Sequence, residues 1–397
     1  LGEFDNALPY LTKSISLGYT ESYLSRGAAL RSLGRYSEAM EDFAMAFIKN
    51  PSLAAGYSNY GNSLREFGMP ELAIPFCQIA QSIDPKDPIH RLNESVSHLM
   101  AGDLVPGWEK YDARWFYDSE VSFKPNWPGP EYDGTQDVTN KTVMVYCEQG
   151  FGDAIQFIRY IPLLKQLNAN VVLCCRQPLI EFFKFNFPDV QVKEIHKEEA
   201  TYNYHVPLMS LPGIFKTTIN TIPVQPVLSV DDNDVAKWHS ILGNTGKKRV
   251  GIVWSSTRVA WTTRFRNIPL EKLLSIKNDS IEFVNLEYDL SQGDELTLNH
   301  NGVRIFKDHI KNFYDTAGLI KNLDLVVAVD TAIVHLSASL GIPTWVLLAD
   351  YGVDWRWFMK RDDSPFYPSV RLFRQDQTNT WEPVLDKVKS ELLILSK

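Results

Sequence analysis

The first 115 residues carry apolar and small residues at the spacing of amphipathic helices, in units that repeat every 34 residues. Small residues at matching positions of each unit let two antiparallel helices approach closely, and a proline closes the unit. The pattern therefore predicts a solenoid of stacked helix pairs over residues 1–117. The matching pairs are Gly27 and Gly61, Gly34 and Gly68, Ala39 and Ala73, Ala46 and Ala80, and Pro51 and Pro85.

The spacing and the residue types of these units resemble those of tetratricopeptide repeats. Residues 2–7 look like residues 34–39, so we expect the chain to begin at the second helix of an earlier repeat, as a fragment of a longer protein. A degenerate last unit ends in Trp108, Tyr111 and Trp115. We interpret their bulky apolar face as a seal between the solenoid and the next domain.

From residue 141 the pattern changes to short apolar strands that alternate with helices, which is typical of α/β proteins. Strands that are apolar at every position favour a parallel sheet covered on both faces. A preceding segment rich in proline, glycine and aspartate predicts a linker. The predicted segments are the linker at 118–140; a short first lobe at 141–228 with strands 142–147, 171–175, 190–194 and 203–206; a second lobe at 247–378 with strands 249–254, 281–286, 303–306, 325–329, 344–348 and 370–373; and an amphipathic helix at 379–397.

Composition and charge exclude several classes of protein. The chain has 397 residues, enough for two or three domains, and its formal net charge of -8 at pH 7 argues against a general nucleic-acid-binding protein. The sequence contains no apolar run of the roughly 18 residues that a transmembrane helix needs. The four cysteines form no C-x-x-C pair, so we expect buried thiols in a reducing, cytoplasmic compartment and no structural zinc site.

The most informative junction follows the predicted strand at 142–147. Gly150 and Gly152 stand directly after it, and Asp153 opens a helical pattern. The glycines let the backbone turn tightly and approach a ligand, and the free N–H groups of the helix suit an anion. Asp153 could take a proton from a bound substrate. The alternative is a tight turn in which Asp153 only caps its helix.

A second junction of the same kind follows the strand at 325–329. Asp330, Thr331 and Ala332 open a helix that also contains His335. The backbone N–H groups of the first turn could bind a phosphate, and Asp330 could hold a sugar hydroxyl. The alternatives are a capping role for Asp330 and a packed helix histidine for His335. Two such junctions in separate α/β segments predict a ligand held in a cleft between two lobes.

A basic segment follows the first strand of the second lobe. It contains Ser255, Ser256, Arg264 and Arg266 and no acidic residue. Arginines and hydroxyls after a strand end could clamp a diphosphate through charge-assisted hydrogen bonds. A solvated basic loop is the alternative.

Two further segments are candidates for ligand contacts. Leu286, Glu287 and Tyr288 end a strand on the same predicted edge and could line a base or ribose pocket, or serve packing alone. Residues 354–357 and 362–368 form an aromatic-rich loop. Tryptophans of this loop could stack on sugar faces, and a seal between lobes is an equal alternative.

The order of these motifs resembles that of tetratricopeptide-repeat glycosyltransferases whose catalytic part is similar to bacterial ADP-heptose:lipopolysaccharide heptosyltransferases. In chain order the motifs are Glu148–Asp153, Pro207–Pro212, Gly251–Trp254, Asp315–Ala317, Leu323–His335 and Asp354–Trp357. The resemblance covers nearly the whole chain. It implies a GT-B fold, with two Rossmann-like lobes facing a cleft and a nucleotide sugar held mainly by the second lobe. It also implies metal-independent, inverting glycosyl transfer.

The resemblance assigns roles to the candidate residues. Asp153 matches the proposed general base of the heptosyltransferases, and Asp330 matches the aspartate that contacts the donor sugar or its phosphates. The diphosphate would lie near helix amides and hydroxyls, with an arginine in place of the family's phosphate-binding lysine. These residues are Thr331, Ala332, Ser255, Ser256, and Arg264 or Arg266. The repeats would supply the acceptor surface, as in protein O-GlcNAc transferases, which share this architecture.

The sequence therefore predicts a cytoplasmic glycosyltransferase that uses a nucleotide sugar as co-substrate and needs no metal. Its partners would be the donor and a protein or glycan acceptor positioned by the repeats, with no nucleic acid. The alternatives are an inactive scaffold whose repeats bind a partner protein, and a nucleotide-sugar epimerase. The sugar, the base, the acceptor and the oligomeric state stay open at this point.

Overall fold

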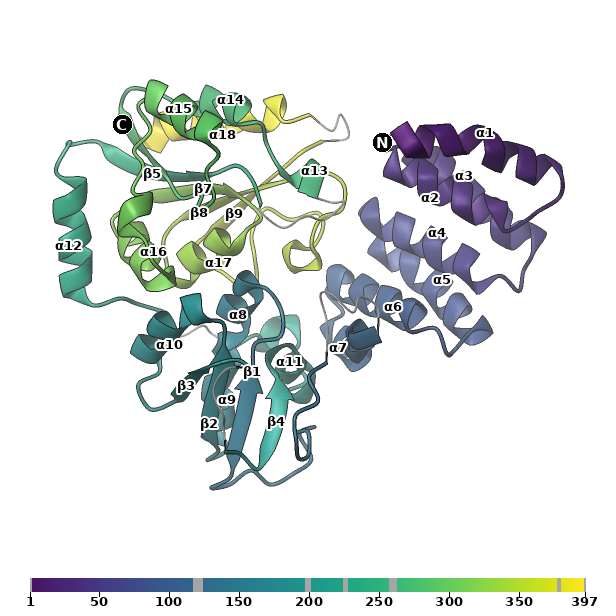
Figure 1. Ribbon diagram of the computed structural model, residues 1–397, viewed down its shortest axis with the longest axis horizontal. Helices are drawn as coiled ribbons and strands as arrows, with labels where there is room; N and C mark the ends of the chain where they lie inside the picture. The colour runs from purple at the N-terminus through teal and green to yellow at the C-terminus, as the bar shows by residue number, and fades with distance from the viewer. Residues whose placement is uncertain are drawn as a thin grey trace. The chain divides into compact units, whose positions relative to one another are not determined.

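The computed structural model describes residues 2–116, 124–196, 201–223, 228–256, 263–376 and 380–395, except the side chains of residues 2, 263 and 264. The first six positions of the predicted linker, 118–123, lie outside this description. The chain divides into two compact units (Figure 1). The repeat unit comprises residues 1–123, 216–219 and 351–359, and the α/β unit comprises the rest.

The repeat unit is built from antiparallel helix pairs, as the period predicts. Its helices are α1 (Gly2–Ser16), α2 (Ser22–Ser32), α3 (Tyr36–Lys49), α4 (Ala54–Glu66), α5 (Pro70–Ile83), α6 (Pro88–Ala101) and α7 (Leu104–Lys110), followed by a 3-10 helix, Tyr111–Phe116. A Cβ added to Gly27 would stand 2.6 Å from the ring of Phe43, and one added to Gly61 would stand 3.0 Å from Cys77 Sγ. The predicted solenoid is therefore confirmed, and Gly27 and Gly61 lie where its helices touch.

A segment from far along the chain, residues 351–359, completes the core of the repeat unit. Tyr351 stacks on Tyr36 with ring centroids 3.7 Å apart, and its hydroxyl donates a hydrogen bond to buried Glu66. Trp355 packs edge-on against Trp108 at 5.2 Å. Buried aromatic surface of this size contributes strongly to stability. The segment is therefore an integral part of the repeat unit.

The first sheet of the α/β unit is parallel, with strand order β3-β2-β1-β4. Its two central strands, β1 and β2, are nearly continuous apolar runs because helices cover them. The elements are β1 (Thr142–Tyr146), α8 (Phe151–Phe157), α9 (Ile161–Gln166), β2 (Asn170–Cys175), α10 (Ile180–Asn186), β3 (Gln191–Glu194), β4 (Tyr204–Pro207) and α11 (Leu211–Ile214). The four cysteines of the chain, three of them at Cys147, Cys174 and Cys175 in this lobe, are buried.

The second sheet is also parallel, with strand order β6-β5-β7-β8-β9. The elements are α12 (Asp232–Leu242), β5 (Lys248–Val253), α13 (Thr263–Arg266), α14 (Leu270–Leu273), β6 (Ile281–Asn285), α15 (Gln292–His300), α16 (Phe313–Ile320), β7 (Leu325–Val329), α17 (Ala332–Ser339), β8 (Thr344–Leu348), β9 (Val370–Arg374) and α18 (Glu382–Leu395). Apolar residues of α18, among them Val384, Val388 and Leu392, share a core with Val250 and Val327 of the sheet.

One predicted strand is wrong. Residues 303–306 do not form a strand, although Arg304 makes an isolated parallel bridge with Val284 of β6. Its N–H donates to Phe283 O at 2.9 Å, and its carbonyl accepts from Asn285 N at 2.8 Å. The pairing stops there because the chain turns into a 3-10 helix at Lys307–His309.

Candidate active site

The strand orders locate the two edges where a ligand is expected. In an open parallel sheet, ligands bind beyond the carboxyl ends of two neighbouring strands whose connections run in opposite directions. In the second sheet this switch point lies between β5 and β7, which lead to Ser255 and Asp330. In the first sheet it lies between β1 and β4. There Glu148, just after β1, accepts a hydrogen bond from Met209 N at 3.3 Å.

The two strand–turn–helix junctions, each of which carries an aspartate, meet within the α/β unit. Helix α8 packs against α17 (Figure 1). At the contact, Gly152 faces His335 and Ala332: an added Cβ would stand 2.7 Å from His335 Cδ2 and 3.4 Å from Ala332 Cα. Only a residue without a side chain fits this approach, so the structure brings together the predicted site residues of both lobes.

Asp153 caps the turn that holds it. The half-buried carboxylate accepts a hydrogen bond from Gly150 N at 2.8 Å through Oδ2. Gly150 is the extended N-cap residue of α8. This is the capping arrangement that the sequence offered as an alternative, and it fixes the direction of the carboxylate. A catalytic role for Asp153 stays a prediction.

Asp330 is tied to the basic segment by Arg266. The guanidinium donates to the carbonyl of Asp330 at 3.0 Å, and its Nη2 lies 3.6 Å from the carboxylate Oδ2. Asp330 is 8% exposed. The contact lets Arg266 hold its positive charge next to the first turn of α17. The side chain of Arg264 lies outside the described residues.

The first turn of α17 has an unusual N-cap. Thr331 is extended, with φ -142° and ψ 174°, and its side chain makes no capping hydrogen bond. Its Oγ1 is buried, and within the part of the chain that the structure describes it has no hydrogen-bond partner. Buried hydroxyls usually find a partner, so the orphaned group needs an explanation. A bound oxyanion at this helix end would supply an acceptor for it.

Glu287 is the most perturbed acid at the carboxyl edge of the second sheet. It is 8% exposed, and this burial raises its pKa to about 7, although Ser255 donates a hydrogen bond to its carboxylate at 3.1 Å. Asn285 exchanges two hydrogen bonds with the Glu287 backbone, at 2.9 and 3.0 Å, and so fixes the strand end. Acidic residues with strongly shifted pKa values are concentrated at functional sites.

The other predicted edge residues lie in different surroundings. Leu286 is buried, and a Cβ added to Gly251 would stand 2.5 Å from its Cδ1, so it packs beneath β5. Tyr288 is 75% exposed. The backbone N–H of Ser256 donates to Asn267 Oδ1 at 3.0 Å, which links both ends of the basic segment. Of the three residues predicted for a base or ribose pocket, Glu287 is therefore the one whose side chain has a clearly shifted pKa.

Two residues lie behind His335: Tyr367, which the sequence placed in the aromatic-rich loop without linking it to His335, and Arg159, which the sequence analysis did not single out. Tyr367 Oη lies 2.9 Å from His335 Nδ1, and Arg159 donates to the carbonyl of Phe366 at 3.1 Å. Both side chains are almost fully buried. A signal was available for Arg159, because a lone arginine in the apolar run 155–164 indicates a buried, paired charge.

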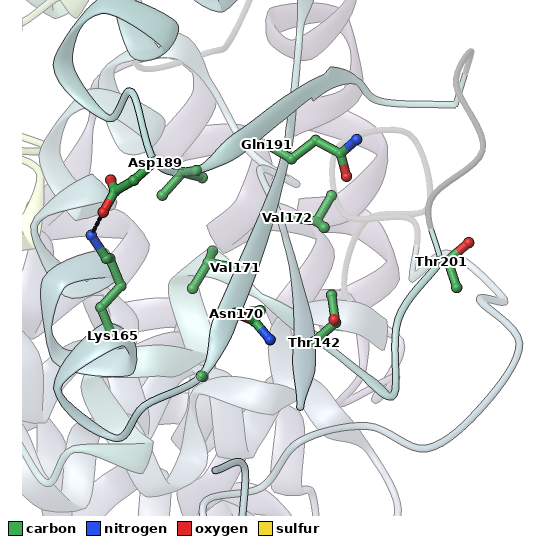
Figure 2. Close-up of a pocket in the computed structure, with 10 residues that line it drawn as sticks. Thr142, Lys165, Asn170, Val171, Val172, Asp189, Gln191 and Thr201 are labelled. Atoms are coloured by element: carbon green, nitrogen blue, oxygen red, sulfur yellow. Dashed lines mark hydrogen bonds and ion pairs between the residues drawn. The ribbon is translucent and has the colours of Figure 1, made fainter. Parts of the chain in front are cut away.

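A separate hollow of about 410 Å³ opens at the opposite edge of the first sheet. Thr142, Asn170 and Gln191, which begin β1, β2 and β3, line it (Figure 2). Lys165 and Asp189 form an ion pair at its side. Because it lies at the amino ends of the strands, it is not part of the site at the carboxyl edge.

The described residues bring together no group of three or more His, Cys, Asp or Glu side chains suited to a metal ion. Within the same residues, no helix is both long and apolar enough to cross a membrane.

Comparisons with known proteins define the fold. No protein-family model matches the chain. Protein FlbA of Caulobacter vibrioides is 25% identical over 399 residues, which cover 92% of this chain and 66% of that protein. A family 9 glycosyl transferase from Veillonella parvula superposes with a TM-score of 0.51 at 9% identity, over 66% of this chain and 99% of its own. This likeness shows that about two thirds of the chain shares the fold of that enzyme.

An ADP-heptose lipopolysaccharide heptosyltransferase II from E. coli aligns with 64% of this chain and 98% of its own, at 12% identity and a TM-score of 0.48. The match to the Veillonella parvula enzyme, together with the helix pairs of the repeat unit, confirms at the level of the fold the resemblance drawn from the motifs, with helical repeats followed by a GT-B architecture. The donor, the acceptor and the roles of individual residues go beyond that level.

Proposed function

We propose that the protein is a glycosyltransferase that moves a sugar from a nucleotide-sugar donor to an acceptor hydroxyl. The observation that carries the proposal is the contact of Gly152 with His335 and Ala332. It joins a turn that carries a carboxylate to a helix N-terminus suited to a diphosphate, in a glycosyltransferase-like fold. Neither junction alone would support a catalytic site, because glycine turns and capped helices are common.

The donor would lie along the carboxyl edge of the second sheet. Its diphosphate would accept hydrogen bonds from the N–H groups of Thr331 and Ala332 and from Thr331 Oγ1, and Arg266 would supply positive charge. Charge that develops on the leaving phosphate would be stabilised by these fixed donors, so the reaction as proposed needs no metal. Glu287 and Ser255 would contact the ribose or the base.

Asp153 would act as the general base. Its carboxylate would deprotonate the acceptor hydroxyl as that oxygen attacks the anomeric carbon, and the nucleoside diphosphate would leave from the opposite face with inversion. A positioned base contributes roughly 10²–10⁴-fold to such a step. The hydrogen bond from Gly150 N would hold the carboxylate in place. The acceptor would be a protein or glycan that the repeat unit positions.

Donor binding is the first test of the proposal. A thermal-shift screen with ADP, UDP, GDP and their sugars, with EDTA present, should show stabilisation by one nucleotide class. A ligand at 100 times its dissociation constant adds about 2.7 kcal/mol to stability, which is readily seen. Absence of a response to every class would contradict the proposal and favour the alternative of a repeat scaffold.

Two aspartates that flank the same strand offer a matched pair of variants. Asp330 follows β7, whereas Asp324 precedes it and accepts hydrogen bonds from Lys248 Nζ and Arg249 N, both at 2.8 Å. Asp330→Ala should weaken nucleotide binding, and Asp324→Ala should lower stability without changing affinity. Equal affinity in the two variants would remove Asp330 from the donor site and leave it only its structural contact with Arg266.

Turnover of the donor tests the role of Asp153. Asp153→Asn keeps an oxygen that can accept the hydrogen bond from Gly150 N, so the turn should survive. Release of nucleoside diphosphate should fall by about 10²–10⁴-fold while donor affinity is retained. Turnover at the wild-type rate would remove Asp153 from the mechanism.

A further inference from the structure

Neutral polar side chains gather around the hollow at the amino ends of the first sheet (Figure 2). They are Thr142, Asn170, Gln191 and Thr201. The register places Thr142 opposite Asn170, and Gln191 opposite Val172. Because residues 170 and 172 point to the same face of β2, the first three polar side chains share one face of the sheet. The volume of about 410 Å³ lies within the range of roughly 300–1,000 Å³ that is typical of small-ligand sites.

The hydrogen-bonding capacity of these side chains is left for solvent or a ligand. Within the part of the chain that the structure describes, none of the four hydroxyl and amide groups has a hydrogen-bond partner. A hydroxyl and an amide each supply both donors and acceptors. The strand ends that carry them are held by the backbone: Thr142 N donates to Asn203 Oδ1, and Asn170 N donates to Lys141 O, both at 2.8 Å. The polar groups are therefore positioned before any ligand arrives.

The charged residues of the hollow neutralise each other. Lys165 and Asp189 form an ion pair, and the hydrogen bond from Lys165 lowers the pKa of Asp189, so both groups stay charged at neutral pH. Among the described residues that line the hollow there is no other charged side chain and no aromatic ring. A phosphate would find no unpaired cation, and a nucleobase would find no ring to stack on. The lining therefore suits a neutral ligand.

The rest of the wall is apolar. Val171, Val172 and Val190 line the hollow and are 4–6% exposed. Small-ligand sites commonly combine such an apolar wall with a few polar groups that fix the orientation of the ligand. A sugar ring has hydroxyl groups around its edge and C–H groups on its faces, so it matches both parts of this lining.

We propose that this hollow is a non-catalytic carbohydrate site, which binds a neutral sugar unit through the two hydroxyls and two amides that line it. Strand β1 has 5 residues, so at about 3.3 Å per residue the hollow lies roughly 16 Å from the carboxyl edge of the sheet. At that distance it takes no part in bond formation. It would hold a part of a glycan acceptor remote from the reacting hydroxyl, and this last step alone rests on the proposed function.

Saturation-transfer nuclear magnetic resonance of the full chain tests the site, with maltose, cellobiose and lactose as neutral probes. At least one of these sugars should give a binding signal at millimolar concentration. Asn170→Ala and Gln191→Ala should each weaken that binding by about 2- to 10-fold, because each removes a neutral hydrogen-bonding group. Gln177→Ala removes an amide just beyond the opposite end of β2 and should bind like the wild type. All three side chains are exposed, so the variants should keep the wild-type Tm.

Three results would overturn the inference. The first is the absence of a signal from all three sugars, and the second is a signal that Asn170→Ala and Gln191→Ala leave unchanged. The third is a stronger signal from glucose 6-phosphate than from glucose that disappears in Lys165→Met, because the hollow would then be an anion site.

Nucleotide titrations separate failure of this inference from failure of the proposed function. Asn170→Ala and Gln191→Ala should bind the responding nucleotide with wild-type affinity, since the hollow lies at the other edge of the sheet. Absence of nucleotide binding to the wild-type protein would contradict the proposed function, and the sugar result would still stand.

Discussion

Replacing Gly152 by alanine probes the contact that the proposed site depends on. The backbone at Gly152 lies in helix α8 and has no positive φ, so alanine is compatible with its conformation. The added methyl group would nevertheless stand 2.7 Å from His335 Cδ2. Real Cβ atoms do not approach other atoms this closely, so one of the two helices must move or the ring must turn.

The size of the effect follows from how firmly His335 is held. Turning its ring breaks the 2.9 Å hydrogen bond with Tyr367, and shifting it strains a buried side chain that is 5% exposed. Overpacking of this kind costs about 1–3 kcal/mol. In domains of 150–250 residues each kcal/mol lowers Tm by about 2–4 °C. We therefore expect Gly152→Ala to lower Tm by several degrees and to weaken nucleotide binding.

Gly293→Ala is a matched control for the assay. Gly293, like Gly152, is the second residue of its helix, α15, and its added Cβ would meet only Ser291 Oγ at 3.8 Å. Alanine is the better helix former, so this variant should be stabilised by up to about 1 kcal/mol. Thermal unfolding should show a lower Tm for Gly152→Ala and a higher Tm for Gly293→Ala. This difference would separate the steric clash at Gly152 from the effect of helix propensity.

A double-mutant cycle with His335→Ala identifies the group that is displaced. Removing the imidazole leaves Ala332 Cα, 3.4 Å away, as the nearest remaining atom, so Gly152→Ala should then cost much less. The interaction energy of the cycle should reach about 1–3 kcal/mol. Additive effects, or a Gly152→Ala protein as stable as the wild type, would refute the reasoning that the two junctions touch here.

Two further predictions concern buried acids. Burial raises the pKa of Glu287 to about 7, above its unfolded value near 4.5, so its stabilising contribution is complete below pH 4.5 and is lost as the pH rises to about 7. Because Glu287→Gln does not titrate, it should gain about 3 kcal/mol relative to the wild type across this window, and parallel pH profiles in urea unfolding would contradict this. Tyr351→Phe should cost about 1–3 kcal/mol in thermal unfolding, because Oε2 of buried Glu66 loses its donor and only Oε1 keeps one, Asn62 Nδ2 at 3.1 Å. Tyr57→Phe, at a half-buried tyrosine, serves as its control. An equal loss of stability in both variants would argue against the Glu66 contact.

The period of 34 was enough to predict the repeats because each unit satisfies its own packing locally. Gly27 lies against Phe43, and Gly61 against Cys77, within one helix pair or between neighbours. The buried strands were equally visible, since a strand covered on both faces must be apolar throughout, as at 325–329. The predicted strand at 303–306 failed because a single bridge to Val284 does not make a strand, and local pattern says nothing about where pairing stops.

At the candidate site, too, some features follow from local sequence and others from tertiary packing. The sequence by itself determined that glycines and an aspartate follow β1, and that a helix opens after Asp330, because these are local backbone requirements. Only the tertiary structure decided that Gly152 meets His335, that Arg159 and Tyr367 stand behind that ring, and that Glu287 is buried enough to change its pKa. Such contacts depend on the packing of segments distant in the chain. Desolvation and hydrogen-bond direction, which set the chemistry of these groups, exist only once the segments have packed.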